Sequence, residues 1–550
     1  MTHRQPRTEL GTHRVENQPP EVGDQDLWGD DPGLRRVVDR EGPDWVGRFL
    51  AELGADLGRE IWFEQGVLAN RCPPELVSFD RHGRRLDEVR YHPSYHALMT
   101  RAIEGEVHRI AWTRQGEGGH LAHVAGLYQL TQPEQGVCCP VTMTHAAIPA
   151  LRRAPGVAGI WEPRVLSARY DPRCLPAEEK HGVTVGMAMT EKQGGSDVRA
   201  NATRAVADGE HWRLTGHKWF CSAPMSDAFL TLAQAPGGLT CFLVPRWQPD
   251  GTRNPFLIQR LKDKCGNRAN ASAEIEYRDT WAEAIGGEGE GVRTIIEMVQ
   301  QTRLDAAVAP VGMLRQALVQ ALHHCRHRRA FGAPLLEQPL MRLVLADLAL
   351  ELEGGLAMVL RVAGAYDRAG DDEQARLFTR LATAVAKYWT NKRAPQAIAE
   401  AMECLGGGGY VEESILPRLY REAPLNGIWE GSGNVICLDV LRAMQRTPET
   451  VPAFLAEVEA GRGGHRHLDA ALDRLRTALT DDSEPQRRAR RITELMALTL
   501  QASLLVQHAP AAVADAFCAS RLGGEAGLAF GTLAPETDTA TILERAGVSP

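Results

Sequence analysis

One carboxylate stands out in segment 428–434, which reads Ile-Trp-Glu-Gly-Ser-Gly-Asn. The indole of Trp429 precedes Glu430, and the small residues 431–433 follow it. An apolar neighbour removes water from a carboxylate and raises its pKa toward neutrality, which suits a general base. Small residues also let a backbone approach a large planar ligand closely. A second interpretation stays open, in which Glu430 marks a helix start and Ser432 caps that helix.

Two further segments carry groups that suit a heteroaromatic ring or a phosphate. Residues 187–197 read Met-Ala-Met-Thr-Glu-Lys-Gln-Gly-Gly-Ser-Asp, so the hydroxyls of Thr190 and Ser196 bracket a glycine pair. Backbone N–H groups in such a loop form concavities that bind anions and ring edges. Residues 217–222 then place an aromatic pair shortly before the hydroxyl of Ser222.

Basic and glycine-rich segments follow in the second half of the chain. Segment 328–332 reads Arg-Arg-Ala-Phe-Gly, and its guanidinium groups suit bidentate pairing with phosphate. The glycine run 406–409 follows a predicted helix, which indicates a helix end and a turn rather than a dinucleotide fingerprint. Three histidines around Cys325 lie among arginines that oppose a cation, so we predict no metal centre.

The elements that must position these groups change character twice along the chain. Helical periodicity runs to about residue 175, and short strands are predicted at 212–215, 229–232, 241–244 and 273–277. Long helices return at 311–324, 339–367 and 374–404, and helical sequence continues at 452–479 and 486–522. The last thirty residues are predicted to form a loosely packed tail.

This pattern predicts an α+β multidomain protein. The segments are an N-terminal extension (1–40), a helical domain (41–180), a β domain (181–288), a helical bundle that carries Glu430 (289–447) and a C-terminal helical region (448–550).

Composition indicates a cytoplasmic globular protein that is not in a membrane. The chain has 550 residues and a net charge of −8, which gives no general attraction to nucleic acid or anionic lipid. Its eleven cysteines include no CxxC pair, so reduced thiols are expected.

Taken in order, these segments resemble the acyl-CoA dehydrogenase superfamily. The T-E-x-x-x-G-S-D loop from Thr190, the K-W-F-x-S strand from Lys218, the R-x-x-F-G segment from Arg328 and the W-E-G-S turn from Trp429 follow that family's order and approximate spacing. Segments 191–197, 260–268 and 428–434 are most similar to its AidB branch, flavoproteins linked to the adaptive response to DNA alkylation.

The resemblance implies a bound FAD and a homotetramer built as a dimer of dimers, with Arg328 and Phe331 reaching a neighbour's flavin across an interface. The implied cofactor-binding residues are Met187, Met189, Thr190, Gly195, Ser196, Phe220, Ser222, Arg328, Phe331, Gly407, Ile428, Trp429, Gly431, Ser432 and Asn434.

It also implies an acyl-CoA dehydrogenase in which Glu430 removes the α proton of an acyl-CoA while the β carbon delivers hydride to the flavin. A minority of relatives carry the base before an Arg-Leu pair, where this chain has Thr302, which cannot serve. Asp305 is a weaker reserve candidate. Because Trp429 is bulkier than the usual tyrosine, we predict short or branched acyl groups; the electron acceptor is not indicated.

Two alternatives stay open. In the AidB branch a DNA-binding role is attributed to the C-terminal region, although residues 450–550 hold ten arginines and no lysine against thirteen acidic residues. Six of these arginines cluster and offer a candidate double-stranded-DNA surface, against the plainer interpretation of a solvated helix face: Arg474, Arg476, Arg487, Arg488, Arg490 and Arg491. A flavoprotein without physiological turnover is the other alternative.

Overall fold

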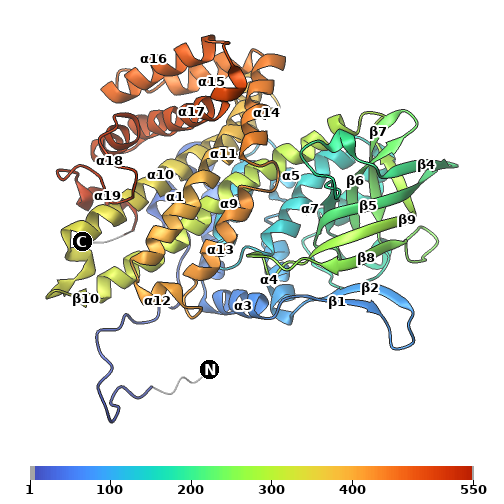
Figure 1. The fold of residues 1–550 in the computed structure, drawn as a ribbon, viewed down its shortest axis with the longest axis horizontal. Helices are drawn as coiled ribbons and strands as arrows, with labels where there is room; N and C mark the ends of the chain where they lie inside the picture. Colours follow the sequence, from blue (N-terminus) through green and yellow to red (C-terminus); the bar gives the residue numbers. More distant parts are fainter. Residues whose placement is uncertain (1–5, 548–550) are drawn as a thin grey trace.

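A closed sheet lies at one end of the molecule and helices form most of the remainder (Figure 1). The computed structural model describes residues 6–547; positions 1–5 and 548–550, at the outer ends of the predicted terminal segments, lie outside the described residues. The predicted α+β multidomain architecture is confirmed. None of the helices in residues 6–547 is both long and apolar enough to cross a membrane.

The N-terminal region is helical, as predicted, but it also contains a hairpin that the sequence did not indicate. Its first helix begins at Pro32, inside the segment predicted as an extension, where the Asp31 side chain accepts a hydrogen bond from the Leu34 N–H. The elements are α1 (Pro32–Glu41), α2 (Asp44–Leu57), α3 (Glu60–Arg71), β1 (Glu75–Phe79), β2 (Arg85–Arg90), α4 (Pro93–Glu104), α5 (Ile110–Thr113), α6 (Gly119–Leu130), α7 (Cys138–Leu151) and α8 (Pro155–Val165).

Seven strands form the central sheet, and all four predicted strand segments lie within it. Pairing runs β6–β7–β9–β5–β4 and returns from β4 to β6, so the sheet closes into a barrel with β3 parallel to β6 and β8 against β9. Closure removes exposed strand edges. The strands are β3 (Val185–Ala188), β4 (Arg204–Asp208), β5 (His211–Ser222), β6 (Ala228–Ala235), β7 (Gly238–Pro245), β8 (Phe256–Leu261) and β9 (Ser272–Ile285).

The central bundle is built on α9, whose 37 residues contact both the N-terminal helices and the barrel. Its elements are α9 (Gly291–His327), the short strands β10 (Arg329–Ala330) and β11 (Ala333–Pro334), α10 (Pro339–Arg368), α11 (Glu373–Glu403), α12 (Gly407–Tyr410), α13 (Leu416–Asn426) and α14 (Gly433–Arg446). One side of α9 packs on α6 and α7 and another on α10 and α11, so a single continuous core joins the two helical regions.

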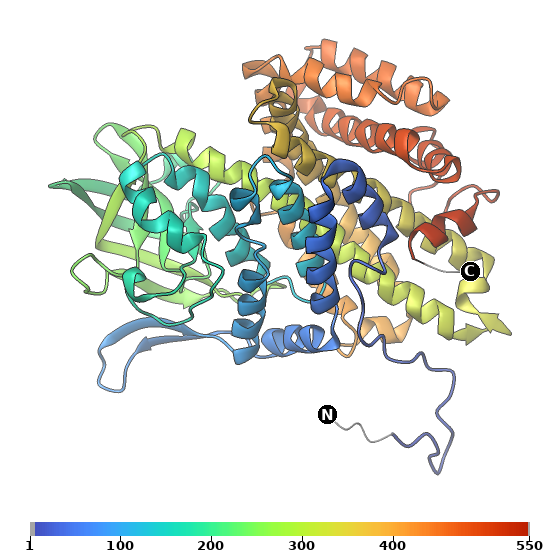
Figure 2. The same cartoon turned by 180° about the vertical axis from the view of Figure 1, so that it is seen from behind.

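The C-terminal helices pack on the bundle, away from the barrel (Figure 2). They are α15 (Thr450–Glu459), α16 (Arg466–Thr480), α17 (Pro485–His508), α18 (Ala511–Phe517) and α19 (Thr539–Arg545). The prediction of a loose tail is wrong, because Leu533 and Ile542 are buried and Arg521 pairs with Asp347 of α10. The sequence did not indicate this packing, because the last thirty residues are mostly small or polar and only a few of their apolar side chains are buried.

A fully buried ion pair anchors the loop that follows β3. Lys218 of β5 donates to Glu191 at 2.8 Å, and neither side chain is exposed. Glu191 also accepts hydrogen bonds from the Thr203 hydroxyl at 2.6 Å and the Ala202 N–H at 2.6 Å. Glu191 therefore fixes the loop against the barrel and points away from solvent.

Replacing Lys218 with Met should lower the free energy of unfolding by about 3–5 kcal/mol, because the Glu191 carboxylate stays buried without its cation. Urea unfolding measures the loss, with the exposed Arg204→Gln change as a control expected to stay within about 0.5 kcal/mol. A loss under about 1 kcal/mol for Lys218→Met would show that the pair does not anchor the loop.

Candidate active site

Glu430 lies in a turn between α13 and α14, and its carboxylate contacts α9. Its backbone has a φ of 55°, in the left-handed region that non-glycine residues rarely adopt. The Thr302 hydroxyl donates to Glu430 Oε2 at 2.5 Å. Ser432 is the N-cap residue of α14, but its side chain makes no capping hydrogen bond to a described residue. The turn thus directs Glu430 toward α9 rather than serving mainly as a helix cap.

Two buried cations hold the backbone of this turn. Lys387 of α11 donates to the carbonyls of Trp429 and Gly431, and the Arg303 Nε donates to the Glu430 carbonyl at 3.2 Å. Arg303 in turn pairs with Asp439 of α14 at 2.8 Å, as does Arg380 at 3.2 Å. Such a network supports a strained backbone that the turn sequence alone would not maintain.

The surroundings of Glu430 suit a base that works near neutral pH. Burial raises the pKa of Glu430, while the Thr302 hydroxyl and the charges of Arg303 and Lys387 oppose that rise. Burial also lowers the pKa of Lys387 to about 7. A carboxylate with a raised pKa that still accepts a hydrogen bond can take up a proton from a weak carbon acid.

The loop after β3 lies against the same hydrophobic cluster as the turn. Met187, Met189 and Trp429 all pack on this cluster, so the structure brings both predicted segments together. The Thr190 carbonyl accepts a hydrogen bond from the Trp219 N–H at 2.7 Å, and a side chain at Gly195 would collide with that of Thr190. Ser196 is exposed at the end of this loop.

The end of β5 supplies an aromatic face and a hydroxyl. Phe220 is 50% exposed, with Lys262 Nζ 4.9 Å from its ring centre. The Ser222 hydroxyl lies 3.5 Å from that of Ser272. The indole of Trp429 is held by a 2.8 Å hydrogen bond from its Nε1 to Asn426.

These residues fit a flavin. The backbone N–H groups of 430–432, and those of Gly195 and Ser196, donate to no backbone carbonyl within the described chain. Free consecutive N–H groups can bond the polar edge of a ring or a phosphate, and an aromatic face such as Phe220 can stack on the ring. Met187, Met189, Thr190, Ile428 and Ser432 lie within or beside these two segments.

Three predicted cofactor residues, Arg328, Phe331 and Gly407, lie far from this turn in the same chain, and Asn434, at the end of the turn segment, is already bonded to α17. Thr302 and Arg328 are about 40 Å apart along α9, at about 1.5 Å per residue. Phe331 is 98% exposed beyond that helix end, and Gly407 follows the far end of α11. Arg328 donates to the Asn17 carbonyl at 2.6 Å, and Asn434 accepts from Arg490 of α17 at 2.8 Å.

The C-terminal arginine cluster is largely engaged with its own chain. Arg476 pairs with Glu459, Arg487 with Glu484 and Arg488 with Asp481, at 2.6–2.8 Å. Arg474 donates to the Leu522 carbonyl, and only for Arg491 do residues 6–547 provide no partner. The cluster is therefore a helix surface with local partners.

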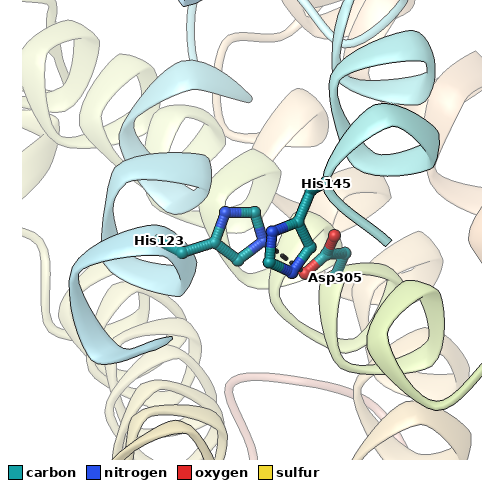
Figure 3. A group of neighbouring side chains, drawn as sticks. All are labelled: His123, His145 and Asp305. Carbon is teal, nitrogen blue, oxygen red and sulfur yellow. Dashed lines mark hydrogen bonds and ion pairs between the residues drawn. The ribbon is translucent and has the colours of Figure 1, made fainter. Parts of the chain in front are cut away.

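The reserve candidate Asp305 belongs to a buried polar cluster (Figure 3). Its carboxylate lies 2.9 Å from His123 Nε2, and the His123 and His145 rings stack with centres 3.6 Å apart. Of the side chains in residues 6–547, only these three converge as a group of three or more potential metal ligands. The cluster joins α6, α7 and α9, and Asp305 already has a buried partner there.

Sequence reasoning missed the partners of Glu430. The sequence predicts no role for Thr302, because a threonine hydroxyl cannot act as the base, although a hydroxyl can orient one. Lys387 could have been recognised as a functional candidate, because it is the only charged residue in the mainly apolar stretch 381–389 of a predicted core helix. Its contact with the turn depends on tertiary packing that periodicity does not specify.

Family models match three consecutive parts of the chain. They describe the N-terminal domain of the adaptive response protein AidB (residues 17–172), the middle domain of acyl-CoA dehydrogenases (186–280) and their C-terminal domain (289–445).

Individual relatives agree with these matches. AidB of Escherichia coli (strain K12) is 45% identical over 94% of this chain and 96% of its own. The structure of ACDH-11 of Caenorhabditis elegans in complex with C11-CoA has 28% identity and a TM-score of 0.85, covering 95% of each chain. The apo form of Bd2924 has 29% identity and a TM-score of 0.82 over 89% of this chain and 99% of its own. The chain therefore belongs to the acyl-CoA dehydrogenases, a family of FAD-dependent oxidoreductases, and within it to the AidB type.

Proposed function

We propose that this protein binds FAD and dehydrogenates short or branched acyl-CoA, with Glu430 as the base. The observation that carries this proposal is the partly buried Glu430 carboxylate, which accepts a hydrogen bond from Thr302, in a turn whose Trp429 packs on the same hydrophobic cluster as Met187 and Met189. A thioester acidifies its α C–H bond, and the Glu430 carboxylate takes that proton. The electron pair left at the α carbon forms the new double bond as hydride leaves the β carbon. FAD, when bound, supplies the acceptor for that hydride.

The chain's own residues set up this step. Thr302 fixes the direction of the carboxylate, and Lys387 and Arg303 fix the backbone that carries it. Burial raises the pKa of Glu430, and we infer that Trp429, its neighbour in sequence, contributes to that burial by limiting water on one side.

We also infer a homotetramer in which the bundle end of one subunit reaches the flavin of another. Large apolar side chains are exposed at this end, with Phe331 at 98% and Tyr410 at 77%. Exposed apolar groups of this size favour a partner surface. The mass of the FAD-loaded protein in solution tests this assembly, and a monomer would contradict it.

DNA binding and a role in the response to DNA alkylation stay predictions from the resemblance. Five of the six clustered arginines already bond to this chain, which favours the solvated helix surface. Affinity for duplex DNA at two salt concentrations tests the alternative, since phosphate contacts give a steep salt dependence.

Glu430→Gln should slow flavin reduction by acyl-CoA about 10²–10⁴-fold, because the amide cannot accept the α proton. Anaerobic stopped-flow bleaching of the FAD-loaded protein measures the rate. Glu413→Gln, at an exposed position, is the matched control and should leave it unchanged. Undiminished reduction by Glu430→Gln protein that retains FAD would refute the assigned base.

Thr302→Val should shift the rising limb of the pH–rate profile to higher pH. The hydroxyl stabilises the charged carboxylate and lowers the pKa of Glu430, so its removal lets burial raise that pKa further. Since only the deprotonated base reacts, activity then begins at higher pH. Thr302→Ser keeps the hydroxyl and should restore the original profile; an unmoved limb in Thr302→Val would disprove the link.

Chain-length preference should depend on Trp429. In the wild type, isovaleryl-CoA and butyryl-CoA should reduce the flavin faster than octanoyl-CoA, and Trp429→Ala should narrow that difference. The comparison includes an eleven-carbon acyl-CoA, because the worm relative is seen with C11-CoA. Faster reduction by octanoyl-CoA than by isovaleryl-CoA in the wild type would show that Trp429 does not restrict the pocket.

A further inference from the structure

A cavity lies beside the residues assigned to the flavin, and one of its wall residues, Lys262, has its Nζ 4.9 Å from the Phe220 ring centre. It has a volume of about 650 Å³ and is bounded by α3, the loop between β8 and β9, and the start of α13. No residue of segments 187–197, 217–222 or 428–434 lines it. Its volume is in the usual range of pockets that bind small molecules.

Cations dominate the wall of this cavity. Two acidic residues, Asp263 and Glu412, face six basic ones: Arg71, Lys262, Lys264, Arg268, Arg418 and Arg421. Lys262 pairs with Glu274 and Arg421 with Glu412. The other four cations form no ion pair within 4 Å anywhere in residues 6–547, so much of the positive charge is available to a ligand.

Arg418 is the most informative of these cations. Its side chain is 5% exposed, and its Nη2 donates to the Pro133 carbonyl at 2.8 Å. Its Nε and Nη1 have no hydrogen-bond partner in the described chain. A side chain at position 66 would collide with the guanidinium, so Gly66 leaves the space that Arg418 occupies. A buried guanidinium with unused donors is costly unless something else accepts from them.

Asn270 adds a second unsatisfied group on the same wall. It is 1% exposed, and neither its Oδ1 nor its Nδ2 has a partner among the described residues. Beside it, Lys264 donates to the Asn270 carbonyl and to the Ser272 hydroxyl at 3.0 Å. Burial lowers the pKa of Lys264 to about 8, as expected of an ammonium group that lacks a carboxylate partner.

Nearby buried acids do not neutralise these cations completely. Glu134 accepts hydrogen bonds from the Val137 N–H and Asn70, and Glu422 accepts from the Asn267 N–H. Burial, with help from Glu134, raises the pKa of Glu422 to about 7, so this carboxyl is often uncharged at neutral pH. Neither acid lies within 4 Å of an Arg418 nitrogen in an ion pair.

We propose that this cavity binds a phosphate ester of about nucleotide size, with Arg418 and Lys264 bonding its phosphate oxygens and Asn270 bonding a polar edge. An arginine fork matches two phosphate oxygens, and four unpaired cations suit a ligand with two or more negative charges. The ester comes either from a free nucleotide or from the nucleotide part of CoA. The second source rests on the proposed function, whereas the first does not.

Calorimetric titration of the full-length, FAD-loaded protein tests the site with pyrophosphate, ADP and CoA. Bound FAD keeps the flavin's own nucleotide site filled, and flavin absorbance verifies that it stays bound. We expect saturable binding that Arg418→Met and Lys264→Met each weaken at least about tenfold, the effect of one lost charge-assisted hydrogen bond. Arg204→Gln, an exposed change of equal charge outside the cavity, should have no effect.

Comparing the three ligands shows which phosphate ester the cavity binds. Equal affinity for ADP and CoA would indicate that the ligand is a free nucleotide. An affinity for CoA at least about tenfold higher than for ADP would indicate that the ligand is the nucleotide part of the CoA substrate. Failure of all three to bind, or binding that both variants retain, overturns the proposal. Because either variant can lose stability, the wild type supplies a second measurement: its melting temperature must rise as the best ligand is added, and no rise overturns the proposal as well. Neither the binding affinity nor the melting temperature depends on turnover, so a negative result in this experiment would not bear on the role of Glu430 as the base.

Discussion

The contact between α9 and the turn that carries Glu430 is the constraint on which the rest of the active site depends. Thr302 holds the carboxylate and Arg303, one residue later, holds the carbonyl of the same residue. Neighbouring residues on one helix therefore fix both ends of Glu430. The position of α9 is itself determined by its packing against α6, α7, α10 and α11. The long helix transmits the rigidity of the core to a turn whose φ of 55° is unfavourable by itself.

Buried charges recur wherever a loop must be placed accurately. Lys387 donates a hydrogen bond to the backbone of the turn, and the ion pair of Lys218 with Glu191 holds the loop after β3. Asp439 forms an ion pair with Arg303. Each group satisfies backbone or side-chain partners, which limits the cost of its burial. These interactions specify geometry more than they add stability. They explain how segments more than two hundred residues apart in sequence come together on one hydrophobic cluster.

Sequence periodicity anticipated β5, β6, β7 and β9 of the seven-stranded sheet and parts of the three long helices, because these elements have a regular pattern of buried positions over many residues. It did not indicate the β1–β2 hairpin, which has only partial burial, or the packed end of the chain around Ile542. The chemistry of Glu430 followed from its neighbours in sequence. Its partners Thr302 and Lys387 did not, since residues about 128 and 43 positions away contact it only through tertiary packing.

A double-mutant cycle on flavin reduction tests most directly whether Thr302 acts through Glu430. The rates to be compared are those of the wild type, Thr302→Val, Glu430→Gln and the double variant, each loaded with FAD and mixed anaerobically with one acyl-CoA. If Thr302 only orients and tunes the base, the double variant should be no slower than Glu430→Gln alone. If the two losses instead multiply, Thr302 acts independently of Glu430, and the account of this site is contradicted.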